Sequence, residues 1–229
     1  MNVSAIIPAA GKSRRFDSKT PKLFVKVGGK PVLFYTLKNI SGAFSFLEII
    51  IASDPFHFKT IEKIISSSGI KNARLVRGGA TRAESVRNGL LSCSEKTDWV
   101  LVHDAARPLV SREVVRRALK AAQGAEGAVS ALPATATVKR VKTGGAISGT
   151  EDRNTLWLAQ TPQIFKKKAL IGRYKKLGRK SSALTDEAAF FDGTGANVRV
   201  ALGAANNFKI TTPEDIELFR FYLSRTKRG

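Results

Sequence analysis

Residues 99–133, WVLVHDAARPLVSREVVRRALKAAQGAEGAVSALP, show the pattern from which the fold class can be predicted. This stretch begins with a short apolar run at 99–103 and ends with another at 127–133, and both runs have the length of a strand. Between them, residues 111–123 have the length and the apolar spacing of a helix. Short apolar runs that alternate with longer helices are typical of βαβ units, in which the strands are parallel and buried.

The same alternation continues on both sides of this stretch. Strands are expected at 3–8, 47–52, 73–77 and 198–202, and helices at 31–41, 55–68, 81–93, 166–177, 185–191 and 213–223. The predicted fold class is therefore α/β, with a Rossmann-like, mostly parallel sheet flanked by helices. Because such sheets bind ligands outside the carboxyl ends of their strands, the functional residues should lie just after each strand. Without a repeat or a linker, residues 1–229 are expected to form a single domain.

One segment, residues 134–164, departs from this rhythm. It has two β-rich limbs, at 135–141 and from Ile147 onward, around a Gly144-Gly145 turn. Because an isolated hairpin is only marginally stable in water, this one needs a surface to lie on. A second copy of the chain would provide that surface. We therefore expect a β-hairpin arm at about 134–155 that joins two chains in a homodimer.

The composition excludes several classes of protein. With 43% hydrophobic and 25% charged residues the chain is globular rather than disordered. No apolar run approaches the roughly 18 residues of a membrane span, and the run at 3–7 resembles a first strand more than a signal peptide, so a cytoplasmic location is expected. Cys93 is the only cysteine, which excludes an intrachain disulfide and a cysteine-rich zinc site. We expect it to be a small buried hydrophobic residue.

The charge indicates an anionic partner. Thirty-nine Lys and Arg residues against 18 Asp and Glu residues give a net charge of +21, which is typical of proteins that bind nucleic acid, phosphorylated small molecules or acidic lipid. The basic residues form three groups: Lys12, Arg14, Arg15, Lys19, Lys22, Lys26 and Lys30; Lys166, Lys167, Lys168, Arg173, Lys175, Lys176, Arg179 and Lys180; and Arg112, Arg116 and Lys120. For the second and third groups the favoured interpretation is a solvated helix surface.

The first basic group surrounds the loop after the first predicted strand, PAAGKSRRF at 8–16, followed by Pro21-Lys22. Two alanines and a glycine allow backbone N–H groups to approach a triphosphate, and Arg14, Arg15 and Lys22 can neutralise phosphate charge. The loop matches neither the P-loop nor the dinucleotide-binding fingerprint. Taken alone, it is equally compatible with a phosphate site and with an ordinary basic loop.

Several motifs together are more specific. The pattern PAAG at 8–11, Arg15 and Pro21-Lys22 resembles the signature of sugar-phosphate nucleotidyltransferases. The rest of the chain resembles one family among them, the 2-C-methyl-D-erythritol 4-phosphate cytidylyltransferases of the non-mevalonate isoprenoid pathway. The supporting segments are Gly78-Gly79 with Arg82 and Ser85, VHDAARP at 102–108, DRN at 152–154, TPQ at 161–163, TDEA at 185–188 and NFKIT at 207–211. They follow the order of the family and span essentially the whole chain.

The resemblance implies a reaction between CTP and a sugar phosphate. An oxygen of the 4-phosphate attacks the α-phosphorus of CTP and pyrophosphate leaves, so fixed cations and Mg²⁺ are what the chemistry needs. By resemblance, Arg15 and Lys22 stabilise the transition state, while Arg153 and Lys209 orient the attacking phosphate. The nucleotide-binding residues would be Ala9, Ala10, Gly11, Lys22, Gly79, Ala80, Arg82 and Ser85. The substrate-binding residues would be Asp104, Arg107, Thr137, Arg153, Thr161, Thr185 and Lys209, and Asp104 would also be the Mg²⁺ ligand.

Three details of the match bear on these expectations. Many relatives carry Asp where this chain has Ala80, and many carry Arg-Asp where it has Thr135-Ala136. His103 should point to the face opposite Asp104, and we interpret it as a packing residue.

Two alternative functions are less favoured. A sister family of cytidylyltransferases acts on ribitol 5-phosphate, but PAAG at 8–11 and DAARP at 104–108 favour the methylerythritol enzyme. A nucleic-acid-binding protein would need aromatic residues among the basic ones, to stack on bases. The first two basic groups hold only Phe16, Phe24 and Tyr174, so nucleic acid is not the expected partner.

Overall fold

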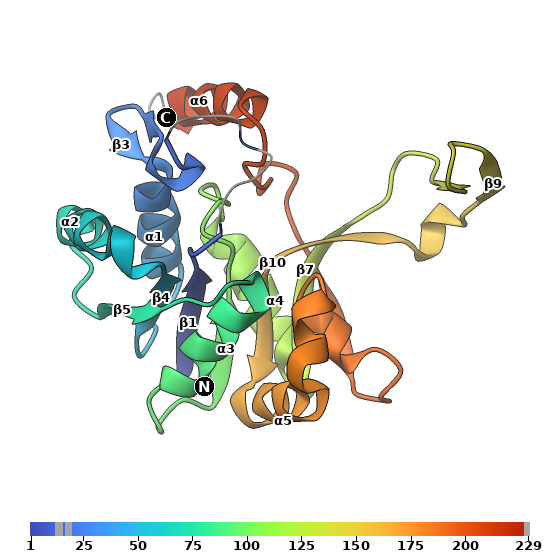
Figure 1. The fold of residues 1–229 in the computed structure, drawn as a ribbon, viewed down its shortest axis with the longest axis horizontal. Helices are drawn as coiled ribbons and strands as arrows, with labels where there is room; N and C mark the ends of the chain where they lie inside the picture. Colours follow the sequence, from blue (N-terminus) through green and yellow to red (C-terminus); the bar gives the residue numbers. More distant parts are fainter. Residues whose placement is uncertain (12–15, 17–19, 227–229) are drawn as a thin grey trace.

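The computed structural model describes residues 1–11, 16 and 20–226 of the chain. The described residues form a seven-stranded sheet with the strand order β11-β7-β10-β6-β1-β4-β5, surrounded by helices (Figure 1). Its strands are β1 (Val3–Pro8), β4 (Ile49–Ser53), β5 (Ala73–Arg77), β6 (Trp99–Val102), β7 (Gly127–Pro133), β10 (Trp157–Lys166) and β11 (Val198–Leu202). Strand β10 is antiparallel to its neighbours β6 and β7, whereas the other neighbouring strands are parallel. The mostly parallel sheet expected from the sequence is therefore confirmed.

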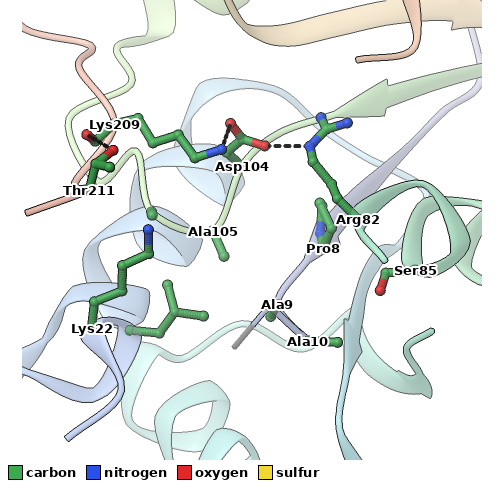
Figure 2. A pocket seen from close by; sticks show the side chains of 13 residues that line it. Pro8, Ala9, Ala10, Lys22, Arg82, Ser85, Asp104, Ala105, Lys209 and Thr211 are labelled. Carbon is green, nitrogen blue, oxygen red and sulfur yellow. Dashed lines mark hydrogen bonds and ion pairs between the residues drawn. The ribbon is translucent and has the colours of Figure 1, made fainter. Parts of the chain in front are cut away.

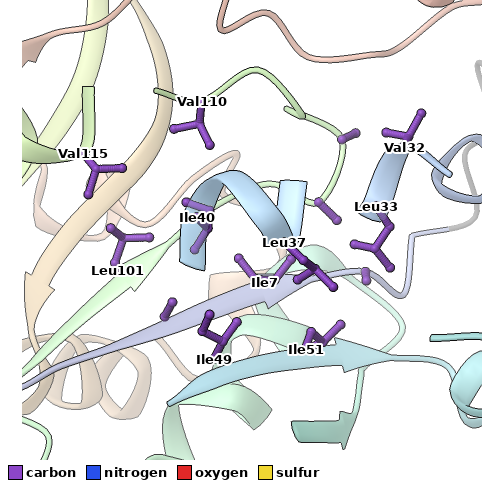
Figure 3. Packing of buried hydrophobic residues seen from close by; sticks show 14 of the residues in the cluster. Ile7, Val32, Leu33, Leu37, Ile40, Ile49, Ile51, Leu101, Val110 and Val115 are labelled. Atoms are coloured by element: carbon purple, nitrogen blue, oxygen red, sulfur yellow. The ribbon is translucent and has the colours of Figure 1, made fainter. Parts of the chain in front are cut away.

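Two hydrophobic cores cover the two faces of this sheet. Because successive strand residues point to opposite faces, Ile7 of β1 belongs to one core and Ile6 to the other. The helices on the Ile7 face are α1 (Val32–Ala43), α2 (Phe58–Ser68), α4 (Arg112–Ala122) and α6 (Glu214–Thr226). On the Ile6 face lie α3 (Arg82–Ser92) and α5 (Lys167–Leu177). Figure 3 shows Leu37 and Ile40 of α1 against Ile7, which fixes this helix over the sheet centre.

Local sequence signals set where the helices begin. The side chain of Thr81 accepts a hydrogen bond from the backbone N–H of Glu84, and Ser111 accepts one from Val114. These caps satisfy N–H groups that have no partner inside a helix. As a result α3 and α4 begin directly after the loops that follow β5 and β6, and these loops are held at one edge of the sheet.

Some elements differ from the prediction. The helix expected at 185–191 is wrong as an α-helix: the chain forms only a short 3-10 helix, η5 (Ala188–Phe191), after Asp186 accepts a hydrogen bond from the N–H of Ala189. Strand β10 and the small hairpin of β2 (Lys26–Val27) and β3 (Lys30–Pro31) were not predicted as separate elements. The remaining 3-10 helices are η1 (Lys22–Phe24), η2 (Pro55–His57), η3 (Arg153–Thr155) and η4 (Gly178–Ala183).

Between β7 and β10 the chain leaves the body of the protein and returns (Figure 1). The excursion contains β8 (Lys139–Val141) and β9 (Ile147–Thr150), which pair antiparallel as a separate two-stranded sheet. Gly144 and Gly145 form the turn with positive φ values of 95° and 90°, which favour glycine. A hydrogen bond from Ala134 N–H to the Leu156 carbonyl, 2.9 Å long, closes its base. We call residues 134–156 the arm; its role in a dimer stays a prediction.

Two expectations from the composition, a buried Cys93 and the absence of a membrane span, can be compared with the structure. Cys93 is buried, as expected, and its thiol lies 3.4 Å from the Gly89 carbonyl. Burial raises the pKa of this thiol to about 12, so it is not a nucleophile at neutral pH. Within the described ranges, none of the helices is long and apolar enough to cross a membrane. The cytoplasmic location stays a prediction from the sequence.

Candidate active site

A cavity of about 290 Å³ opens at the carboxyl ends of β1 and β6, where the sheet topology predicts a ligand site (Figure 2). The loop after β1, the loop after β6, the start of α3 and two segments distant in sequence surround it. Its lining residues are Pro8, Ala9, Ala10, Gly11, Lys22, Leu23, Arg82, Ser85, Asp104, Ala105, Ala106, Lys209 and Thr211. We call it the main cavity.

Close packing holds the loops after β1 and β5 together. The N–H of Ala9 donates to the Ala52 carbonyl and that of Gly78 to the Ser53 carbonyl, each at 2.7 Å. A Cβ atom on Gly78 would come within 2.5 Å of the Ala10 Cβ, so only glycine allows this approach. The small side chains of the first loop are thus required by packing as well as by access of a ligand to the backbone.

The segment after Gly78 is fixed by the first turn of α3. The buried hydroxyl of Ser85 accepts a hydrogen bond from Gly79 N–H at 3.0 Å and donates to the Thr81 carbonyl at 2.9 Å. The N–H of Ala80 donates to the carboxylate of Glu84 at 2.8 Å. Gly79 and Ala80 are therefore fixed next to Ser85, which lines the main cavity, but are not themselves among its lining residues.

A second cavity, of about 190 Å³, adjoins the first. Its lining residues are Arg82, Asp104, Arg107, Ala159, Gln160, Thr161, Gln163, Thr185, Asp186 and Lys209. Three of these residues, Arg82, Asp104 and Lys209, also line the main cavity. The two cavities therefore meet at one acidic and two basic side chains.

Asp104 is the centre of this junction. One of its oxygens accepts a hydrogen bond from Arg82 Nε at 2.9 Å, and the other lies 3.0 Å from the Lys209 ammonium and 3.5 Å from Arg107 Nε. Burial disfavours the charged form of this carboxylate, but the charges of Arg82, Lys209 and Arg107 outweigh that cost and hold its pKa well below the usual range. Asp104 is thus a permanent anion that places three cations around one point.

Arg82 continues this charge network into the protein interior. Its Nη1 group donates to both carboxylate oxygens of Glu187, at 2.9 Å each. Although burial disfavours the charge of Arg82, Glu187 and Asp104 raise its pKa above the usual range. Burial also raises the pKa of the Glu187 carboxyl, and the charge of Arg82 opposes that effect. The guanidinium is therefore held from two sides.

His103, expected to be a packing residue, is fully buried and also makes two hydrogen bonds. Its Nε2 lies 3.1 Å from the Arg107 carbonyl, which can only accept, so Nε2 carries the proton. Its Nδ1 then accepts from the Thr161 hydroxyl at 3.0 Å, and the Thr161 oxygen accepts from the N–H of Asp104 at 3.0 Å. Burial lowers the pKa of His103 to about 4, consistent with this neutral form. The chain of bonds fixes the backbone that bears Asp104.

Lys22 and Lys209 approach the main cavity from segments distant in sequence. The Lys22 ammonium donates to the Ile210 carbonyl at 2.7 Å, and the N–H of Ile210 donates to the Ala106 carbonyl at 2.8 Å. The Thr211 hydroxyl donates to the Lys209 carbonyl at 3.1 Å. These bonds tie the segment after β11 to the loop after β6, and Figure 2 shows both lysines pointing into the same space.

The structure brings most of the predicted site residues together. Eight line the main cavity: Ala9, Ala10, Gly11, Lys22, Arg82, Ser85, Asp104 and Lys209. Arg107, Thr161 and Thr185 line the second cavity. Thr137 and Arg153 lie exposed on the arm, where Arg153 donates to the Thr135 carbonyl at 3.0 Å, and neither is among the described residues that line these two cavities. Arg15 lies outside the described residues.

Sequence reasoning missed several residues of the site. Thr211 lines the main cavity, Gln160, Gln163 and Asp186 line the second, and Glu187 holds Arg82 from behind. All but Gln160 lie inside the quoted motifs, at 161–163, 185–188 and 207–211. The sequence places Glu187 in the motif at 185–188, beside the predicted site residue Thr185. What identifies its role is the burial of its carboxylate, which only the structure shows.

The acidic residues of the site limit how it could hold a metal ion. Asp104 is the only acid among the described lining residues of the main cavity, and no group of three or more His, Cys, Asp or Glu side chains suited to a metal occurs in the part of the chain that the structure describes. A single carboxylate fits Mg²⁺, which is commonly held by one or two carboxylates together with substrate phosphates. Asp104 would supply that carboxylate.

The chain is similar to known proteins over nearly its whole length. The sequence model of the 2-C-methyl-D-erythritol 4-phosphate cytidylyltransferase family matches residues 3–225. A protein of that name from Syntrophus aciditrophicus is 38% identical over 228 residues, covering 97% of this chain and 96% of its own.

Two solved structures are also similar. One is the 4-diphosphocytidyl-2C-methyl-D-erythritol synthase of Anaerococcus prevotii, with a TM-score of 0.86, 31% identity and coverage of 97% of this chain and 98% of that one. The other is the 2-C-methyl-D-erythritol 4-phosphate cytidylyltransferase of Thermus thermophilus, with a TM-score of 0.76, 33% identity and the same coverage, 97% and 98%.

Proposed function

The chain belongs to the 2-C-methyl-D-erythritol 4-phosphate cytidylyltransferase family, and from this premise we propose how its two cavities divide the reaction. As a member, it transfers the cytidylyl group of CTP to 2-C-methyl-D-erythritol 4-phosphate in isoprenoid biosynthesis. In our proposal the main cavity holds CTP and the second holds the sugar phosphate. The observation that carries this division is that Arg82, Asp104 and Lys209 line both cavities, because the two reacting phosphates must meet at one place.

The nucleotide would bind along the loop after β1. The backbone at Ala9, Ala10 and Gly11 would contact the triphosphate, since their small side chains leave the N–H groups accessible. The base would lie toward Ser85, with the Gly79–Ala80 segment behind it. Ala80 replaces the aspartate of many relatives, and its N–H is bonded to Glu84, so the side chain at position 80 is not needed to fix this segment.

The chemical step would occur at the junction. Arg107, Thr161 and Thr185 would hold the sugar phosphate, and Lys209 would orient its 4-phosphate toward the α-phosphorus of CTP. The attacking oxygen forms the new P–O bond while the bond to pyrophosphate breaks. Lys22 and Arg15 would stabilise the charge that develops on the α-phosphoryl oxygens, so the protein acts through fixed charge rather than covalent catalysis.

Mg²⁺ fits this assignment as a partner of the bound triphosphate, with Asp104 as the one carboxylate among the described residues that line the main cavity. When bound, it would neutralise part of the triphosphate charge. EDTA should then abolish turnover and added Mg²⁺ should restore it. Full activity in EDTA would remove the metal from the proposal.

The arm would complete the site of a second chain. It carries Thr137 and Arg153, and two of its apolar side chains, Val141 and Ile147, are exposed at 53% and 67%. Exposed apolar residues on a hairpin that is marginally stable alone favour a partner surface. In a symmetric dimer, each arm would lie against the neighbour and bring Thr137 and Arg153 to the neighbour's second cavity.

The experiment that tests this function measures pyrophosphate release from CTP with purified protein. Release should require 2-C-methyl-D-erythritol 4-phosphate and should be much slower with ribitol 5-phosphate. Lys209→Ala should lower the rate at saturating CTP. A rate independent of the sugar phosphate, or unaffected by Lys209→Ala, would contradict the proposed division of the cavities.

A further inference from the structure

Glu187 is a fully buried carboxylate that lines neither cavity. It accepts two hydrogen bonds from Arg82 Nη1, and the hydroxyl of Tyr174 reaches its Oε1 at 3.5 Å. The same hydroxyl donates to the Ala83 carbonyl at 3.0 Å, directly after Arg82 in α3. Glu187 therefore lies in the interior between α3 and α5, and its carboxylate is bonded to a residue of the site, Arg82.

A buried carboxylate at this place costs stability. Removing an ion from water is costly, and a well-packed apolar residue often serves the fold equally well. The partner of Glu187 is not buried to the same degree: the Arg82 side chain is 25% exposed, on the side where both cavities lie. The pair thus joins the interior to the point where the two phosphates would meet.

The pairing with Asp104 and Glu187 uses only part of the hydrogen-bond donors of Arg82. Nε donates to Asp104 and Nη1 to both oxygens of Glu187. To the residues that the structure describes, Nη2 donates no hydrogen bond, so its N–H groups are available to a ligand. Without the charge of Glu187, the guanidinium would be free to form a two-pronged pair with Asp104, the arrangement that arginine and carboxylate favour. That pair would take up Nη2.

We propose that Glu187 is a positioning residue for cytidylyl transfer, holding Arg82 so that Nη2 can donate to a phosphoryl oxygen where the two cavities meet. This inference rests on the proposed division of the cavities. It assigns Arg82, which the sequence analysis names only as a nucleotide-binding residue, to the reacting phosphates. Arg82 acts there by charge and hydrogen bonding and transfers no proton.

The first test separates kcat from KM in three variants. Glu187→Gln should lower kcat by about 10–100-fold, the usual effect of losing a residue that orients a site group, while KM for CTP changes little. Glu187→Asp keeps the charge and should lose less. Tyr174→Phe removes the neighbouring hydroxyl but not the carboxylate, and serves as the matched control with near-normal kcat. Rates are expressed per folded protein, measured by circular dichroism.

The second test is chemical rescue, which a merely structural role would not produce. In Arg82→Ala, guanidinium chloride below denaturing concentration should raise kcat by about tenfold or more, part of the 10²–10³-fold that a preorganised donor supplies. Methylammonium chloride at the same concentration should not, because its donors share one nitrogen and cannot reproduce the planar fork with which guanidinium pairs with both carboxylates and a phosphoryl oxygen. In Arg82→Ala combined with Glu187→Gln, the guanidinium effect should disappear.

The outcomes distinguish the inference from the function on which it rests. If wild-type protein releases no pyrophosphate from CTP and the methylerythritol phosphate, the proposed function fails. If the wild type is active but guanidinium and methylammonium act alike on Arg82→Ala, the role of Glu187 is wrong. This comparison needs no substitution at Glu187 and remains decisive if Glu187→Gln does not fold. Normal kcat in Glu187→Gln would also overturn the inference.

Discussion

The Arg82–Glu187 pair in the body and the Arg140–Glu151 pair on the arm have the same chemistry but different surroundings. Their N–O distances are 2.9 and 2.6 Å. The side chains of the first pair are 25% and 0% exposed, whereas those of the second are 69% and 31% exposed. An exposed pair is screened by water and salt, so the shorter distance does not make it the stronger interaction. Burial, not distance, therefore distinguishes the Arg82–Glu187 pair, which holds a residue of the site, from the Arg140–Glu151 pair, which is a surface contact.

The same contrast holds for the two regions as a whole. Around Asp104, five segments of the chain are tied to one another by internal hydrogen bonds and ion pairs: those that carry Lys22, Arg82, Asp104, Thr161 and Lys209. The arm instead pairs with itself and exposes Ile147, while carrying two predicted substrate residues. The rest of the chain forms both cavities by itself, whereas we expect the arm to function only against another surface. The predictions below test this difference.

The largest effect is expected at Lys22, in the body. Lys22→Ala should lower kcat by about 10²–10³-fold, because a preorganised cation no longer faces the developing charge. Its hydrogen bond to the Ile210 carbonyl adds about 1 kcal/mol of stability, so the variant should still fold. Lys26→Ala, an exposed lysine on β2, is the matched control with normal kcat. A Lys22→Ala variant that keeps more than about a third of wild-type kcat would exclude Lys22 from the catalytic set.

The second prediction compares the two ion-pair environments by stability. Asp104→Asn should lower the free energy of unfolding by about 3–5 kcal/mol, because the cations around it lose a buried counter-charge. Glu151→Gln, in the arm pair, should leave the urea midpoint nearly unchanged. Urea unfolding followed by circular dichroism measures both. Equal losses in the two variants would show that burial does not separate the pairs.

The third prediction concerns pH. Because burial lowers the pKa of His103 to about 4, protons bind the unfolded chain first as the pH falls. The stability that neutral His103 contributes is fully present above its ordinary pKa of about 6.5 and is lost between pH 6.5 and 4, by an amount on the order of 3 kcal/mol.

His103→Gln keeps a donor and an acceptor but does not titrate. Its unfolding free energy should therefore depend less on pH in this window than that of the wild type. Urea midpoints at several pH values measure the difference between the two proteins, which should narrow as the pH falls. Parallel curves would show that His103 does not cause the acid sensitivity.

The local sequence was sufficient to predict elements that short-range pattern determines. Strands β1, β5, β7 and β11 have the predicted bounds, because each is an apolar or β-branched run between turn residues. The antiparallel placement of β10 between β6 and β7 could not be predicted in this way. It depends on pairings between residues far apart in the chain, such as Gln163 with Val102, which no local pattern encodes.

For the site, too, the sequence identified individual residues but not the contacts between them. Motifs identified Asp104 and Lys209 separately, but their ion pair joins residues more than a hundred positions apart. Glu187 lies in a quoted motif, yet only its burial against Arg82 reveals a role. Four expectations stay predictions: the homodimer, the bound Mg²⁺, the single domain, and a partner other than nucleic acid. They concern partners or domain boundaries rather than contacts within the described chain.

The central claim, that a body from one chain and an arm from another form each site, is tested most directly by mixing two inactive variants. Lys22→Ala chains are unfolded with Arg153→Ala chains and refolded together. With random pairing about half the dimers are mixed, and each mixed dimer has one site with both changes and one with neither. Roughly a quarter of all sites should then be active, although each variant refolded alone is not.

Thr137→Val replaces Arg153→Ala in a parallel mixture, since Arg153 lies near the base of the arm. Wild-type chains refolded under the same conditions must regain activity and dimerise. Recovery of about a quarter of wild-type activity in either mixture is the result expected from a shared site. No recovery in both mixtures, with wild-type chains refolding normally, would show that the arm serves only its own chain.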